Sequence, residues 1–169
     1  VMRMKRLLKY LLITILIACP LAGTLISSCG EDSGCSLGGR AMLQCNVYAY
    51  KEGTLTKAAL TKLTVTAFDT DSIIINAQTN VQDLSLPLRY TQEITVFVLH
   101  YGDDDTMKDT VTIQHNNTSS FISLECGYEM QQSVTDVAYT KHVLDSISVK
   151  RINPNVNGQE NLQLFYTTD

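Results

Sequence analysis

The sequence predicts an all-β fold, an antiparallel β-sandwich of roughly eight to ten short strands. Apolar residues recur with a period of two in short runs rich in Val, Ile, Thr, Tyr and Phe, the pattern of half-buried strands. Clusters of Gly, Asn, Asp and Pro separate these runs, and the helical period is nearly absent. Strands at this spacing without intervening helices favour a sandwich over a parallel α/β sheet.

Each predicted strand is a run that alternates between apolar and polar positions and ends at turn-forming residues. In chain order these runs are 42–50, 62–68, 72–77, 85–90, 93–101, 110–115, 121–126, 136–142, 144–152 and 161–167. The turn formers between them lie at 69–71, 102–105, 116–117 and 153–158. We expect a hairpin across 102–105 and a further tight turn at 116–117.

Two segments need a separate interpretation. Residues 54–60 contain the helix formers Lys57, Ala58 and Ala59 but are too few for a stable helix, so we expect a loop or a single turn. Pro87 cannot donate a ladder hydrogen bond, so its strand should lie at a sheet edge or carry a bulge.

The N-terminal residues resemble an export signal. Residues 2–9 carry a positive cluster, residues 10–17 are almost wholly apolar, and small residues precede Cys29. This layout resembles a lipobox, the site where lipoprotein signal peptidase cleaves before a cysteine that has received a diacylglyceryl group. We expect a signal peptide over 1–28, an acylated Cys29 with a tether over 29–40, and a β-sandwich domain over 41–169. Further acylation, as with palmitate, would belong to the same anchor.

Two alternatives to this interpretation remain. The segment ending at Cys19 has a similar small-residue pattern, but cleavage there would leave the apolar stretch 21–26 on the mature protein. Residues 7–28 are also long enough for an uncleaved transmembrane anchor, although Pro20 and Gly23 disfavour it. In every case the domain is exported.

Charge limits the partners of the mature protein. Removal of residues 1–28 takes away four of the 13 basic residues and none of the 17 acidic ones, which moves the net charge from −4 to −8. Nucleic acid and anionic membrane surfaces are poor partners for such a protein.

Three cysteines remain after Cys19 leaves with the signal and Cys29 takes the lipid. At least one disulfide is expected in an exported domain, and we favour Cys35 with Cys126, which would fix the tether to a segment ~90 residues further on. Cys45 shares a strand face with apolar neighbours and is expected to be a buried free thiol.

The chemistry-bearing residues give weak indications. Asp103, Asp104, Asp105 and Asp109 could bind calcium, but a solvated hairpin turn explains the same residues better. We expect no other metal site, no cofactor and no enzymatic activity, because the sequence lacks the common nucleophile, zinc and phosphate-loop motifs.

The three histidines give no metal site either. Pairing across the turn is expected to place His100 opposite Val111 and His115 opposite Val96, which separates the two histidines by ~13 Å. His142 has no evident partner in the sequence.

Four tripeptides, at 71–73, 105–107, 109–111 and 145–147, read Asp, then Ser or Thr, then an aliphatic residue or Met. They resemble the O-glycosylation motif of exported Bacteroidetes proteins. Turns that end in Asp and lead into β-branched strands explain them equally well.

The segments 26–33, 109–113, 123–128 and 152–166 together resemble an uncharacterised family of small Bacteroidetes lipoproteins, a domain of unknown function. The resemblance covers most of the chain from about Cys35 onward. It implies a lipid-anchored protein of the cell envelope, at the outer membrane, and it implies no activity. We expect a binding or structural module with an envelope protein partner, or alternatively a module that binds a glycan or calcium.

Overall fold

The computed structural model describes residues 39–104, 106–124 and 126–167. It contains ten strands: β1 (Leu43–Lys51), β2 (Thr54–Lys57), β3 (Leu60–Ala67), β4 (Ile73–Val81), β5 (Asp83–Leu86), β6 (Ile94–Tyr101), β7 (Lys108–Ser123), β8 (Gly127–Tyr139), β9 (Ser146–Val149) and β10 (Leu162–Thr167). Within the described ranges there is no helix, and hence none that could cross a membrane. The predicted all-β fold is confirmed.

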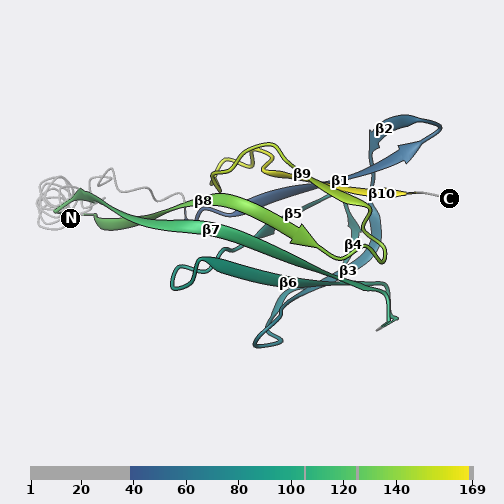
Figure 1. The fold of residues 1–169 in the computed structure, drawn as a ribbon, viewed down its shortest axis with the longest axis horizontal. Coiled ribbons are helices and arrows are strands. Elements are labelled where there is room, and N and C mark those ends of the chain that lie inside the picture. Colours follow the sequence, from purple (N-terminus) through teal and green to yellow (C-terminus); the bar gives the residue numbers. More distant parts are fainter. Residues whose placement is uncertain (1–38, 105, 125, 168–169) are drawn as a thin grey trace, which may run out of the picture. The chain divides into compact units, whose positions relative to one another are not determined.

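Two five-stranded sheets form the sandwich (Figure 1). One has the order β2-β1-β10-β9, with β5 paired to the same side of β1 as β2. The other has the order β4-β3-β6-β7-β8. All pairs are antiparallel except β1 with β10, which are parallel from Cys45 opposite Leu162 to Tyr50 opposite Thr167. The predicted antiparallel sandwich thus contains one parallel pair.

The core lies between the sheets and follows the predicted alternation. In β1 and β6 every second residue is buried, and these residues meet the inward-facing positions of the other strands. Cys45 is buried in this core as a free thiol, as predicted. Burial raises the pKa of the Cys45 thiol, and the nearby carboxylate of Glu160 raises it further, so the thiol stays neutral.

The segment 54–60, predicted as a loop, instead contains strand β2. Lys51 pairs with Thr54, and the two residues between them, Glu52 and Gly53, both have positive φ. This is the backbone of a type I′ turn, whose twist matches that of a two-stranded hairpin. The turn residues explain the strand better than the helix propensity that follows them.

The turn predicted at 116–117 was also wrong. Asn116 and Asn117 lie inside β7, which is 16 residues long and pairs with β8 from Val111 to Ser123. β6 pairs with β7 only as far as Gln114, so the rest of β7 and its partner β8 continue as a two-stranded ribbon beyond β6.

Pro87 follows directly after β5, which pairs only with β1 among the described strands and so lies at a sheet edge. The predicted strand 85–90 therefore ends at Leu86, because Pro87 cannot continue the ladder.

Candidate functional site

The segment 87–93, which connects β5 to β6, accepts hydrogen bonds through its backbone carbonyl groups from side chains of β7 and β8. The amide nitrogen Nδ2 of Asn117 lies 3.1 Å from the carbonyl oxygens of Arg89 and Tyr90 and 2.7 Å from that of Gln92. Gln132 Nε2 donates to the Arg89 oxygen as well, at 2.9 Å. A loop that would otherwise be mobile thus has its backbone acceptors satisfied by β7 and β8.

A buried histidine completes this network. His115 Nδ1 lies 3.0 Å from Asn117 Oδ1, and His115 Nε2 lies 2.8 Å from the hydroxyl of Thr95. Asn117 Oδ1 can only accept, so Nδ1 carries the proton and Nε2 accepts the Thr95 hydroxyl proton. The Thr95 oxygen in turn accepts the backbone N–H of Arg89 at 2.9 Å.

Burial lowers the pKa of His115, although the hydrogen bond to Asn117 and the charge of Glu93 act in the opposite direction. The imidazole is therefore neutral at pH 7, as the assigned tautomer requires. The neutral imidazole, with both ring nitrogens hydrogen-bonded, therefore has a structural role in supporting the loop.

The loop presents Tyr90 to solvent, and Arg89 of the loop and Arg40, which precedes β1, lie at the same surface. The guanidinium carbon of Arg40 lies 4.1 Å from the centre of the Tyr90 ring, a cation–π contact, and Arg40 also donates to the backbone oxygen of Leu88. Arg89 Nη1 is paired with Asp69 Oδ2 at 2.6 Å and with Gln92 Oε1 at 2.6 Å. These contacts fix the Arg40 guanidinium group over the Tyr90 ring and the Arg89 guanidinium group against Asp69 and Gln92.

Two open hollows adjoin Tyr90, and together they are here named the Tyr90 groove. The first, of about 600 Å³, is lined by Arg40, Ala67, Asp69, Thr70, Arg89, Tyr90, Thr91 and Gln92. The second, of about 510 Å³, is lined by Tyr90, Thr91, Gln92, Glu93, Ile94 and Asn117. The groove combines an aromatic face, cationic groups and amides on a rigid base, which suits ligand binding and offers no nucleophile paired with a base.

The predicted acidic cluster does not come together. Asp103 is exposed, at 86% of its side chain, and pairs with Lys62, whereas Asp109 is wholly buried. Asp104 accepts the backbone N–H and the hydroxyl of Thr106, which lowers the pKa of its carboxyl group. Asp105 lies outside the described residues. Among the residues described, no group of three or more His, Cys, Asp or Glu side chains is placed to hold a metal ion.

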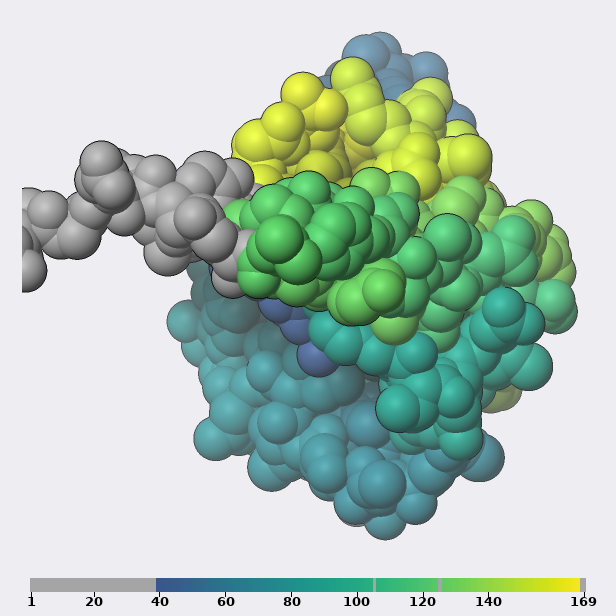
Figure 2. Space-filling model, turned by 90° about the vertical axis from the view of Figure 1, so that its left-hand side faces the viewer, coloured from purple at the N-terminus to yellow at the C-terminus, as the bar shows by residue number. Residues whose placement is uncertain are grey.

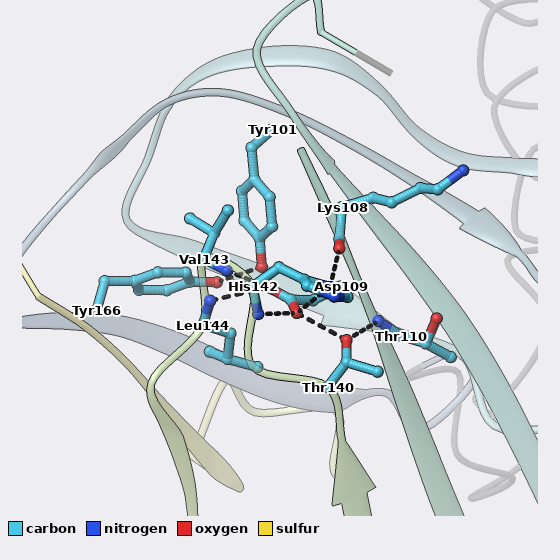
Figure 3. Close-up of polar contacts among 9 residues, drawn as sticks. All are labelled: Tyr101, Lys108, Asp109, Thr110, Thr140, His142, Val143, Leu144 and Tyr166. Carbon is cyan, nitrogen blue, oxygen red and sulfur yellow. Dashed lines mark hydrogen bonds and ion pairs between the residues drawn. The ribbon is translucent and has the colours of Figure 1, made fainter. Parts of the chain in front are cut away.

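Asp109 instead fixes the segment that leads from β8 to β9 (Figure 3). Its carboxylate accepts the Thr140 hydroxyl at 2.7 Å and three successive backbone N–H groups, those of His142 at 2.8 Å, Val143 at 2.9 Å and Leu144 at 2.8 Å. The carboxylate oxygens thus have donors from the chain itself at every usual acceptor position. Asp109 acts as an internal cross-link.

Two opposing effects set the pKa of Asp109. Burial raises the pKa, but the hydrogen bonds from His142, Thr140, Leu144 and Val143 together lower it by more. The net pKa therefore lies below the ordinary value of 3.8. The Tyr101 hydroxyl lies 3.3 Å from that of Tyr166, and burial together with the nearby charge of Asp109 raises the pKa of both tyrosines. The aspartate is therefore ionised throughout the neutral range.

The histidine register was predicted wrongly. His100 lies opposite Lys108, and Val96 lies opposite Thr112, a shift of three positions from the expected pairing. The cause is that β7 begins at Lys108, inside the segment predicted as a turn. His142, for which no partner was predicted, bonds to the Lys108 carbonyl at 2.9 Å through Nδ1.

The structure describes two of the five cysteines, Cys45 and Cys126. Cys126 is disulfide-bonded, and Cys45 is free, so the two do not pair with each other. The predicted partner Cys35, and the predicted lipidation site Cys29, lie outside the described residues, as do residues 1–28. The Cys35–Cys126 pairing stays a prediction.

Sequence reasoning missed the residues that form the groove. Arg40, Arg89 and Tyr90 belong to no motif, and Asn117 was assigned to a turn. The one available signal was Pro87, which marks an exposed edge followed by a loop. The pairing of Arg40 with a loop 50 residues further on requires the fold.

Comparisons with known proteins give one match. Residues 62–166 match the model of a family of unknown function (DUF6452). No curated protein and no solved structure matches the chain.

Proposed function

The chain belongs to the family of unknown function DUF6452, and starting from this membership we propose that it is a lipid-anchored, non-enzymatic binding module of the cell envelope, at the outer membrane. Cys29 carries the lipid, residues 29–40 form the tether, and the sandwich displays the Tyr90 groove to another envelope component. Because the family carries no activity that could be transferred, support comes from the sequence and the groove.

The observation that carries the proposal is the fixed arrangement of Arg40 and Arg89 around Tyr90. The mature protein has a net charge of −8, yet two of its nine basic residues, Arg40 and Arg89, line the hollow beside the exposed Tyr90 ring. Arg and Tyr are the residues that contribute most binding energy at protein interfaces. Their support by Asn117 and His115 reduces the conformational entropy lost on binding.

A site-specific photo-crosslinker tests the binding role. We expect a crosslinker at Tyr90 to capture one envelope component in intact cells, and the Arg40→Ala substitution to abolish that adduct. Tyr50, which is 53% exposed on β1, is the matched control position and should give no such adduct. Equal capture at both positions, or capture unaffected by Arg40→Ala, would contradict the assignment of the groove.

A glycan ligand is the second candidate, favoured by the exposed Tyr90 ring beside the polar side chains of Thr91 and Gln92. Binding of a ligand to the native state raises the melting temperature. We expect a stabilising glycan to lose its effect in the Tyr90→Ala variant. Unchanged melting temperature across a panel of envelope glycans would leave a protein partner as the ligand.

Intact mass of the membrane-extracted protein tests the anchor. The expected mass is that of a chain beginning at Cys29 with added acyl groups, and the Cys29→Ala variant should lack this addition. An intact N-terminus, or a chain that begins at Cys19, would refute the proposed anchor.

A further inference from the structure

The β7–β8 hairpin ends in an apolar tip that the sandwich does not cover. Leu124 is 95% exposed, Tyr128 73%, Phe121 54% and Ile122 45%. Phe121 and Tyr128 face each other across the ribbon, with ring centres 5.3 Å apart in an edge-on contact. These four exposed apolar side chains lie within eight residues at the end of the hairpin and are here named the hairpin tip. Exposed apolar surface of this kind marks an interaction site.

The hairpin tip stands apart from the rest of the domain. Beyond Gln114 the ribbon has no partner in β6, and Figure 2, which views the molecule from this end, shows the green residues of the ribbon in front of the sheets. Cys126, between Leu124 and Tyr128, is disulfide-bonded, which stiffens the tip. A projecting tip of this kind can contact another surface without disturbing the packing of the core.

The end of the ribbon carries no basic residue. Between residues 114 and 128 the sequence contains no Lys or Arg, and Glu125 is its only acidic residue. Attraction to an anionic surface is therefore absent, and the favourable term is the removal of apolar surface from water. Burial of one Leu- or Phe-sized side chain strengthens such partitioning by about tenfold or more.

The described chain begins beside the base of this same ribbon. Ala41 lines a hollow of about 280 Å³ with Glu129, Met130, Gln131 and Gln132 of β8. Gln132 lies four residues from Tyr128 along β8, ~14 Å at the rise of a strand. Cys29 precedes Gly39 by ten residues, which span at most ~35 Å. A lipid on Cys29 would thus hold this end of the domain at the membrane, with the hairpin tip within reach.

We propose that the hairpin tip is a second membrane contact, which inserts Phe121, Ile122, Leu124 and Tyr128 into the lipid surface that holds the acyl chains of Cys29. This inference rests on the proposed lipid anchor. The two contacts together would set the orientation of the sandwich, whereas the lipid on Cys29 alone would leave the domain free to rotate. An apolar tip with an aromatic pair suits the interfacial region of a bilayer.

Because the chain contains no Trp, a single introduced Trp reports its own surroundings. The acylated full-length protein would carry Leu124→Trp or, as the matched control, Leu55→Trp, an exposed position in β2 at the other end of the domain (Figure 1). Both variants would be reconstituted into phosphatidylcholine vesicles containing brominated lipid, which quenches Trp fluorescence at close range. Tyr128→Trp provides a second reporter at the tip.

We expect emission from the Leu124→Trp variant to shift to the blue and to be quenched about threefold or more strongly than emission from the Leu55→Trp variant. The quenching should be unchanged in 1 M salt, where the Debye length of about 3 Å screens electrostatic attraction. Equal quenching in an acylated sample overturns the proposed tip contact and leaves the anchor standing. A blue shift that grows with protein concentration without lipid assigns the tip to a second copy and also overturns it. A sample that carries no acyl mass refutes the anchor and the tip contact together.

Discussion

Replacement of Asp109 by Asn tests the internal cross-link between β7 and the segment before β9. The side-chain volume is unchanged, but one carboxylate oxygen becomes an NH₂ group, which faces two donors in either orientation. Two buried donors would lose their acceptor, each at a cost of ~1–3 kcal/mol. We expect Asp109→Asn to lower the free energy of unfolding by about 4 kcal/mol, out of a total of roughly 5–15 kcal/mol for a domain.

Urea unfolding of the oxidised protein measures this change. Asp103→Asn is the matched control, because it makes the same substitution at a carboxylate that is 86% exposed and paired with Lys62. An exposed pair contributes ~1 kcal/mol or less, so the control should unfold close to the wild type. A loss below about 1 kcal/mol in Asp109→Asn would refute the cross-link, since it would mean that water or other groups satisfy the same donors.

The pH dependence provides a second readout of the same carboxylate. The folded-state pKa of Asp109 lies below the ordinary value of 3.8, so its contribution to stability is present above about pH 4 and is lost as the pH falls through the folded-state pKa. Asp109→Asn has no titrating group there. The stability difference between the wild type and the variant should therefore shrink in acid.

Three further predictions concern the loop support and the core. Burial lowers the pKa of His115 below 6.5, so the unfolded state binds more protons than the folded state. The free energy of unfolding should therefore fall as the pH drops from 7 to 5. The His115→Gln substitution should flatten this pH dependence, and an unchanged pH dependence would contradict the buried neutral imidazole. Asn117→Ala should cost ~2–4 kcal/mol and speed amide exchange in residues 89–93, while exchange rates equal to the wild type would show that the loop is held otherwise. Cys45 should resist a thiol reagent until the protein unfolds, and labelling of the native protein would disprove its burial.

The fold class could be predicted because alternation is a local signal. In β1 the residues Leu43, Cys45 and Val47 all face inward, and the sequence places them on one face without knowledge of any partner strand. The ends of strands were predicted less well where a turn residue has a tertiary role. Pairing direction was not predictable, because the same alternation serves a parallel and an antiparallel neighbour, and β10 joins β1 from more than 100 residues away.

The candidate groove could not be predicted because its parts are distant in the chain. Arg40 precedes the first strand, Tyr90 follows an edge strand, and Asn117 supports the loop from the middle of β7. Each residue alone is an ordinary surface or turn residue. Only the register of β6 with β7 brings Asn117 beneath the carbonyl groups of the loop, and that register differed by three positions from the one expected from the sequence.

Two asparagines, Asn117 and Asn161, explain part of what the sequence could not show. Asn161 was expected to begin the last strand, yet it lies just before β10, is wholly buried, and donates to the carbonyl oxygens of Arg151 at 3.1 Å and Asn153 at 2.6 Å. Its Oδ1 accepts the backbone N–H of Gln44 at 2.9 Å. An asparagine amide mimics the hydrogen-bonding groups of a peptide, so it can either initiate a turn or replace a missing strand neighbour. Asn117 and Asn161 both replace a missing strand neighbour. Each one fixes an irregular connection to a sheet that no helix covers in the described part of the chain.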